Sequence, residues 1–227
     1  MVDLKYIGGI FGWVASGISL YFFLSPGVPF YKLIKGHIKL ADAPGVLLIF
    51  SFLNCLLWLN YGLLVDKAQM YGTNGSGGAI TLIYITIFLI FLTKQIYYYT
   101  ILLILLLIAI IGVITYFSYF VIDYKIVGIS ANVFNVCMYA ATGEKIYRVF
   151  KTKNYNLMPI FSIVGAFLSS GCWVIYGTFD FDYNVIIPNA LGVIFSMIQL
   201  VVYFHFYCQK KNDEDLLNTS NEDDKLI

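Results

Sequence analysis

The chain has 227 residues, of which 60% are hydrophobic and 12% are charged, and its formal net charge is +1. An ordinary soluble domain carries roughly 25% charged residues, so this composition excludes a soluble globular protein and indicates a membrane protein. The near-zero net charge argues against a nucleic-acid partner, which would need a basic surface.

Seven apolar runs follow one another along the chain, and a run of about 20 residues is enough to cross a bilayer core. They are Tyr6–Leu24, Pro44–Leu64, Tyr71–Thr93, Ile101–Ile122, Ile126–Ala141, Pro159–Phe179 and Tyr183–Tyr207. The first run lacks the basic start and the cleavage site of a signal peptide, so we expect it to remain as a span. The runs predict an all-α integral membrane protein with seven transmembrane helices.

The loops between the runs predict the orientation. With the N-terminus outside, the inner segments hold eleven Lys or Arg residues and the outer segments hold three. Basic residues accumulate on the cytoplasmic side of membrane proteins. We therefore expect an outer N-terminus and a cytoplasmic C-terminus.

An internal repeat divides the chain. The unit Trp58-x-x-Tyr61-Gly62, followed by Asn74, recurs 115 residues later as Trp173-x-x-Tyr176-Gly177, followed by Asn189. A unit of three spans that starts outside ends inside, so the fourth span must return the chain before the second unit begins. This pattern predicts two parallel three-helix bundles, with a substrate site between them. The predicted parts are residues 1–97 (first triple-helix bundle), 98–123 (linker helix), 124–209 (second bundle) and 210–227 (an acidic cytoplasmic tail, expected to be disordered).

Two asparagines occupy equivalent positions in the repeats. Asn74 lies near the start of the third span and Asn189 near the start of the seventh. An amide inside a bilayer needs a partner, and it offers both a donor and an acceptor, as a sugar hydroxyl does. The pair therefore predicts a clamp for a small polyol, with hydrogen bonding between helices as the alternative.

Two tryptophans form a second equivalent pair. Trp58 and Trp173 could present an aromatic wall to the apolar face of a sugar, or could instead anchor their helices at the membrane interface. Asn54 lies one helical turn before Trp58, and its counterpart in the second repeat is Ser169. These two polar residues are further candidates for substrate contact.

Prolines mark the inner ends of three spans. Pro26 ends the first span, and Pro44 and Pro159 open the second and sixth. Proline frees a backbone carbonyl and bends a helix, which suits an inner gate, although it is also common in the first turn of a straight helix.

The outer ends carry a different set of residues. Tyr61, Tyr176 and Asp182 lie at or just beyond the outer ends of their spans, and hydrogen bonds among them would close the outer side. Membership of an aromatic belt is the alternative reading for the two tyrosines.

The sequence lacks the residues that several common functions require. No acid lies well inside a span, which favours passive and bidirectional transport over proton or sodium coupling. His37 and His205 have no companions that would make a metal site or a catalytic triad, and no P-loop, HExxH or GxSxG pattern occurs. We expect no enzymatic activity, no catalytic residue, no metal and no cofactor.

Three segments resemble the SWEET family of sugar facilitators. They are Leu24–Lys32 (LSPGVPFYK), Lys151–Pro159 (KTKNYNLMP) and Ile187–Gly192 (IPNALG), and together with the repeated Trp–Tyr–Gly unit the likeness covers about residues 8 to 208. The resemblance implies seven spans and movement of mono- or disaccharides down their gradient by alternating access. It also implies a pocket at Trp58, Asn74, Trp173 and Asn189, hinges at Pro26, Pro44 and Pro159, and an outer gate at Tyr61, Tyr176 and Asp182.

The chain departs from the family pattern at Thr142, where many members have a fourth proline, so we expect the inner gate of the second half to be built differently. Two tryptophans at the wall positions leave little room, so we expect a monosaccharide, such as glucose or another hexose. The alternative is a PQ-loop amino-acid exporter, but glycine or isoleucine replaces glutamine after each hinge proline. The expected partners are a small sugar and membrane lipid, with a homo-oligomer left open. The plasma membrane is the expected location, with a Golgi or vacuolar membrane as the alternative.

Overall fold

The computed structural model describes residues 4–40, 43, 45–120, 123–158 and 160–223. Its helices are α1 (Leu4–Leu24), α2 (Gly27–Ile34), α3 (Gly45–Leu64), α4 (Ala68–Ile90), α5 (Lys94–Phe120), α6 (Lys125–Thr152), α7 (Ile160–Asp180) and α8 (Tyr183–Asp223), with a short 3-10 turn at Tyr155–Leu157. Seven helical segments are long and apolar enough to cross a membrane. The predicted all-α fold with seven spans is confirmed for the part of the chain that the structure describes.

Three boundaries differ from the sequence prediction. The break at Ser25–Pro26 is followed by a separate short helix, α2, which the apolar pattern did not indicate. Helix α6 continues to Thr152, well past the predicted end of its span, and the pair of Glu144 and Arg148 at a spacing of four residues supports this polar extension.

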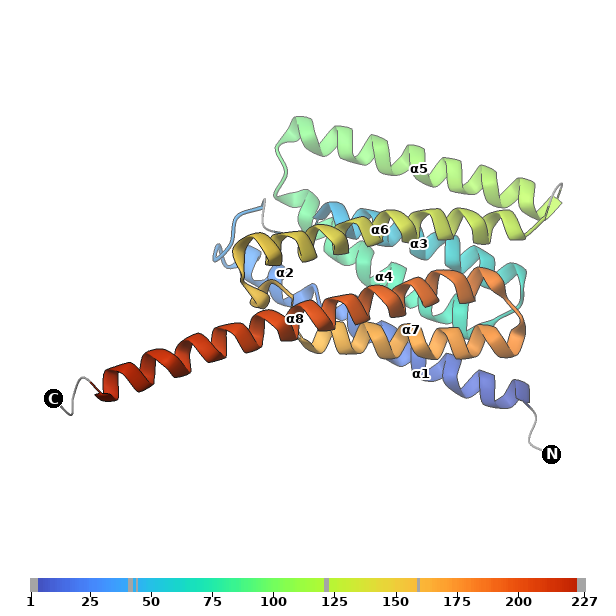
Figure 1. Cartoon of the computed structure of the whole chain (residues 1–227). Helices are drawn as coiled ribbons and strands as arrows, with labels where there is room; N and C mark the ends of the chain where they lie inside the picture. The colour runs from blue at the N-terminus through green and yellow to red at the C-terminus, as the bar shows by residue number, and fades with distance from the viewer. Residues whose placement is uncertain (1–3, 41–42, 44, 121–122, 159, 224–227) are drawn as a thin grey trace.

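The third difference is the tail. It was expected to be disordered from residue 210, but α8 continues as a helix to Asp223. A helix that has already formed in the membrane gains one hydrogen bond for each residue added, so its extension does not require a new nucleus. In Figure 1 this last part of α8 projects beyond the rest of the molecule.

The helices run side by side, with the N-terminus and the α3–α4, α5–α6 and α7–α8 connections at one end (Figure 1). We call this the Asp182 end, and the opposite end, with the 3-10 turn, the Met158 end. Helices α1, α3 and α4 pack together, as do α6, α7 and α8, and the two groups meet where α1 contacts α7 and where α3 contacts α6. The repeat makes α1 equivalent to α6 and α3 equivalent to α7. The contact of α1 with α7 is therefore equivalent to the contact of α6 with α3, and the same helix pairing occurs twice at the interface.

Helix α5 stands apart from both groups. It lies along the outside of the bundle in Figure 1, and its only buried residues are Ile111 and Ser118. A helix that faces lipid needs no polar face, because its backbone groups are all paired within the helix. This explains why residues 101–111 of this helix are an almost unbroken run of Ile and Leu.

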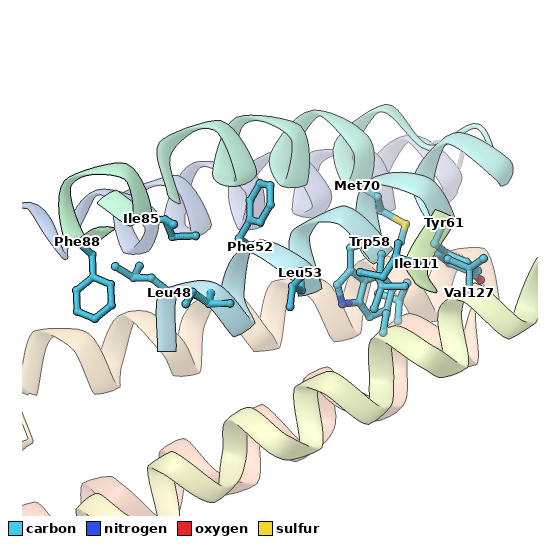
Figure 2. Packing of buried hydrophobic residues seen from close by; sticks show 14 of the residues in the cluster. Leu48, Phe52, Leu53, Trp58, Tyr61, Met70, Ile85, Phe88, Ile111 and Val127 are labelled. Atoms are coloured by element: carbon cyan, nitrogen blue, oxygen red, sulfur yellow. The ribbon is translucent and has the colours of Figure 1, made fainter. Parts of the chain in front are cut away.

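The main buried cluster follows the inner faces of α3 and α4. Figure 2 shows it extending from Phe88 and Leu48 to Trp58, Tyr61 and Val127. The cluster thus leads from the Met158 end to the residues that border the candidate site.

Glycines allow the helices to approach closely at equivalent points. A side chain at Gly77 would collide with the ring of Phe23, and one at Gly192 would lie 2.6 Å from the hydroxyl of Ser170 and 3.0 Å from that of Tyr139. Phe23 and Tyr139 are themselves equivalent, at an offset of 116. The repeated glycines therefore keep the same space free in each half of the molecule.

Candidate functional site

A cavity of about 180 Å³ lies between the two helix groups. It is lined by Ser19, Phe23, Asn54, Trp58, Met70, Thr73, Asn74, Asn135, Ser169, Trp173, Val185 and Asn189. All five residues predicted to contact a substrate are among these twelve. The structure therefore brings Trp58, Asn74, Trp173, Asn189 and Asn54 to one place, and their contact with a sugar stays a prediction.

The lining is built from equivalent pairs. The offset of 115 relates Trp58 to Trp173, Asn74 to Asn189, Asn54 to Ser169 and Met70 to Val185, and the offset of 116 relates Ser19 to Asn135. Each half of the molecule thus contributes one side of the cavity. A ligand in it would contact both halves at once.

The paired asparagines are held in the same way. The Asn74 side-chain nitrogen donates to the backbone oxygen of Met70 over 2.9 Å, and that of Asn189 donates to Val185 over 2.8 Å. Each amide is therefore fixed by its own helix, rather than by the neighbouring helix that the alternative reading required. Since one amide hydrogen is used in this way, the side-chain oxygen of each residue remains available to accept from a ligand hydroxyl.

Two further polar pairs cross between the halves, and they are equivalent to each other. Asn54 donates to Asn135 over 2.9 Å, and the hydroxyls of Ser19 and Ser169 lie 3.1 Å apart. The side-chain oxygen of Asn54 is buried and has no hydrogen-bond partner among the described residues. The two equivalent contacts between the halves are thus made by amides on one side of the cavity and by hydroxyls on the other.

Sequence reasoning missed Asn135 and Ser19, although a signal for them was present. Ser19 lies seven residues before Pro26, and Asn135 lies seven residues before Thr142, which is the position equivalent to Pro26. Extending the repeat comparison into the first and fifth spans would have selected both residues.

Both tryptophans border the cavity. Trp58 is 7% exposed, and its ring meets Tyr61 edge to face with centroids 5.7 Å apart. Trp173 makes the same contact with Tyr176 at 5.4 Å, and its indole nitrogen donates to Ser19 over 3.3 Å. A tryptophan that anchors a helix at the membrane interface would be exposed to headgroups. The burial of Trp58 therefore favours a role as an aromatic wall of the cavity.

At the Asp182 end, one predicted gate contact is present. The Tyr61 hydroxyl lies 2.9 Å from each carboxylate oxygen of Asp182 and accepts from the Asn184 side chain over 3.2 Å. Tyr61 belongs to the first helix group, and the other two residues to the second. This bonded set therefore joins the two halves beyond the cavity.

The third predicted gate residue, Tyr176, belongs to the same buried cluster as Tyr61 and lies near Asp182, but it makes no hydrogen bond to either. Among the described residues, its buried hydroxyl makes no hydrogen bond of normal geometry, although the Asp180 carboxylate lies close to it. The position equivalent to Asp182 on that side is Lys67, which instead forms an ion pair of 2.9 Å with Asp180. This second contact between the halves was not predicted, because Lys67 and Asp180 do not occupy equivalent positions in the repeat.

The hinge prolines can be placed only in part. Pro26 lies at the junction of α1 and α2, where its backbone oxygen accepts from Phe30 over 3.0 Å. Pro44 and Pro159 lie outside the described residues. Thr142 lies within the uninterrupted helix α6, so the second half has no helix break at the position where Pro26 ends α1.

Comparison with known proteins gives a consistent picture. A family described as "Sugar efflux transporter for intercellular exchange" matches the chain twice, at residues 9–96 and 125–212. The chain is 34% identical to the bidirectional sugar transporter SWEET5 of Arabidopsis thaliana, covering 95% of this chain and 93% of that protein. It is 31% identical to SWEET7 of the same plant, covering 92% and 84%. A solved eukaryotic SWEET transporter superposes with a TM-score of 0.81 at 26% identity, covering 90% of this chain and 97% of that one.

Proposed function

The chain belongs to the MtN3/SWEET family, and from that membership we propose that it is a passive, bidirectional transporter of a monosaccharide, glucose or another hexose, that works by alternating access. The observation that carries the proposal is the cavity between the halves, with one asparagine and one tryptophan from each repeat. Carbonyl oxygens that accept from hydroxyls, beside aromatic rings that pack on C–H surfaces, suit a small sugar.

The size of the cavity supports a monosaccharide over a disaccharide. Its volume is about 180 Å³, at the position where both wall residues are tryptophans. Ligand pockets for larger molecules run to roughly 300–1,000 Å³. A hexose is therefore the substrate that this conformation favours.

The contacts between the halves support a closed state at the Asp182 end. The bonded set of Tyr61, Asp182 and Asn184 and the ion pair of Lys67 and Asp180 both join the two bundles on that side of the cavity. In the proposed cycle these contacts break when the Asp182 end opens, and the halves 1–97 and 124–209 rock about the central cavity. The bias in basic residues supports an Asp182 end on the non-cytoplasmic side, which is the extracellular side if the protein is in the plasma membrane.

The test is uptake of radiolabelled glucose by proteoliposomes that contain the full chain. We expect Asn74→Ala and Asn189→Ala each to lower uptake about tenfold, because a lost hydrogen bond of about 1.4 kcal/mol corresponds to that factor. Asn60→Ala is the matched control, since Asn60 makes the same bond to its own helix, over 2.8 Å to Leu56, but does not line the cavity. Normal uptake by both pocket variants would remove this site, and stimulation by a proton gradient would exclude passive transport.

A further inference from the structure

Two cavities lie beyond the central one at the Asp182 end. The first, which we call the aromatic vestibule, has a volume of about 360 Å³ and is lined by Tyr61, Val65, Lys67, Tyr124, Lys125, Ile129, Asp180, Phe181, Asp182, Tyr183 and Asn184. The second, the counterpart cavity, has a volume of about 270 Å³ and is lined by Gly8, Gly9, Asp66, Lys67, Ala68, Gln69, Tyr176, Phe179 and Asp180. The repeat relates the two: Tyr61 corresponds to Tyr176, and Asn184 to Gln69.

The two cavities differ in their aromatic content. Tyr124, Phe181 and Tyr183 border the vestibule, and the equivalent positions in the counterpart cavity are Gly8, Asp66 and Ala68. A belt that anchors the protein in the interface would serve both halves alike. The fold does not require these rings either, because the other half forms the same turn without them. The aromatic set is therefore specific to one cavity.

One of these aromatic residues is held in a costly conformation. Phe181 has a φ of 53° and its equivalent Asp66 a φ of 52°. Aspartate tolerates this left-handed region, but for a bulky residue it is a strained exception. The Phe181 side chain is also 80% exposed, so burial in a core does not compensate for the strain. A ligand that packs on the ring would give this costly placement a function.

Polar groups complete the vestibule. The Asp182 carboxylate and the Asn184 amide lie beside the Tyr61 hydroxyl, and the ion pair of Lys67 and Asp180 adds a second carboxylate. Exposed rings above carboxylate and amide groups are the same combination that suits a sugar in the central cavity. Tyr61 is 2% exposed and its ring meets Trp58 edge to face, so these two rings separate the vestibule from the central cavity.

We propose that the aromatic vestibule is a second sugar-binding site, on the extracellular side of the closed gate, and that it accepts disaccharides as well as hexoses. This inference rests on the proposed function and orientation. The vestibule has twice the volume of the central cavity, about 360 Å³ against about 180 Å³. A disaccharide therefore binds outside without being transported, and blocks the entry of glucose.

The test adds sucrose to one side at a time. In intact cells that express the full chain, external sucrose should inhibit influx of labelled glucose competitively, without itself being taken up, whereas injected sucrose should leave efflux unchanged. The inhibition constant should rise about tenfold in a variant with Phe181→Asp and Tyr183→Ala. These substitutions introduce the residues that the counterpart cavity already carries at Asp66 and Ala68, so the backbone can accept them.

The matched control is Asp66→Phe, which adds a ring to the counterpart cavity and should leave sucrose inhibition unchanged. The proposal is overturned if external sucrose does not inhibit, if the double variant is inhibited as strongly as the natural chain, or if sucrose inhibits equally from both sides. Absence of glucose transport would count against the proposed function instead. Sucrose binding would then be measured by saturation-transfer NMR on the full chain in nanodiscs, where loss of signal in the double variant supports the vestibule and an equal signal refutes it.

Discussion

At the scale of single residues, the cavity is lined by side chains that are held in place but keep part of their hydrogen-bonding capacity available. Asn74 and Asn189 each donate one hydrogen to their own helix and keep an oxygen free. Trp58 and Trp173 are held edge to face by tyrosines, so their rings cannot rotate away from the cavity without losing those contacts. In the proposed transporter, polar recognition and size selection would therefore belong to different pairs of residues.

Trp58→Ala should separate these two roles. Removing the ring enlarges the cavity, so we expect sucrose to become a transported substrate, while the KM for glucose rises about fivefold through loss of roughly 1 kcal/mol of aromatic contact. Uptake of both sugars by proteoliposomes measures the change. Trp13→Ala is the control, because Trp13 is 57% exposed and does not line the cavity. If the two variants behave alike, Trp58 acts as an anchor and not as a wall.

Much of this residue-level site could be predicted from the sequence, because the repeat marks equivalent positions. Asn74, Asn189, Trp58 and Trp173 were found in that way and all line one cavity. Tyr176 was expected to join the outer gate with Tyr61, but its hydroxyl has no hydrogen-bond partner among the described residues. The repeat specifies which residues are equivalent, but not whether equivalent residues find the same partners.

At the scale of helices, glycines determine how closely the elements pack. Gly77 on α4 lies against the ring of Phe23 on α1, and that ring lines the central cavity. Gly72, on the same helix, has no neighbouring atom within 4 Å of an added Cβ. The same residue type thus serves a tight contact at one position and leaves open space at the other.

Gly77→Ala should therefore be harmful and Gly72→Ala should not. The methyl group at residue 77 displaces the Phe23 ring at a cost of about 1–3 kcal/mol, so we expect a lower thermal midpoint and a higher KM for glucose. At residue 72 the same change should stabilise the helix by about 0.5–1 kcal/mol. Thermal unfolding in detergent and glucose uptake check both variants. Equal effects would mean that helix propensity, not packing, governs this helix.

The helices themselves were predictable because lipid demands long apolar runs with internally paired backbones. The extensions of α6 and α8 were not, because charged residues end an apolar run without ending the hydrogen-bonded ladder of a helix. Helix α2 was missed for a related reason: Pro26 was expected only to end the first span, yet proline is tolerated at the start of a helix, where α2 begins.

At the scale of the whole molecule, the halves are joined asymmetrically at the Asp182 end. One connection is the hydrogen-bonded set of Tyr61, Asp182 and Asn184. The other is the ion pair of Lys67 and Asp180, whose side chains are 33% and 15% exposed. Opening that end requires both connections to break. The ion pair should therefore shift the balance between closed and open forms.

Lys67→Met should favour opening at the Asp182 end. A partly exposed ion pair contributes up to about 1 kcal/mol, which corresponds to about a fivefold shift in a two-state balance. Hydrogen exchange at the backbone of residues 177–186 should speed up accordingly, and Asp180→Asn added to the first change should have little further effect. Lys125→Met is the control, because Lys125 pairs over 3.6 Å with Asp123, which lies beside it in the connection between α5 and α6. Equal exchange in all variants would show that the pair does not hold the gate.

The loose attachment of α5 has a consequence for how such a protein can change over generations. A connecting helix with only two buried residues imposes little on either side, so each half can accumulate substitutions almost independently. The shared cavity restrains both halves, since any change there alters a surface that the two build together. In the outer turns the same restraint applies to Lys67, Asp180 and Asp182, which join the halves, but not to the exposed ring of Phe181. The two copies of a duplicated segment could therefore diverge at this position, one with Asp66 in its turn and the other with the exposed ring of Phe181.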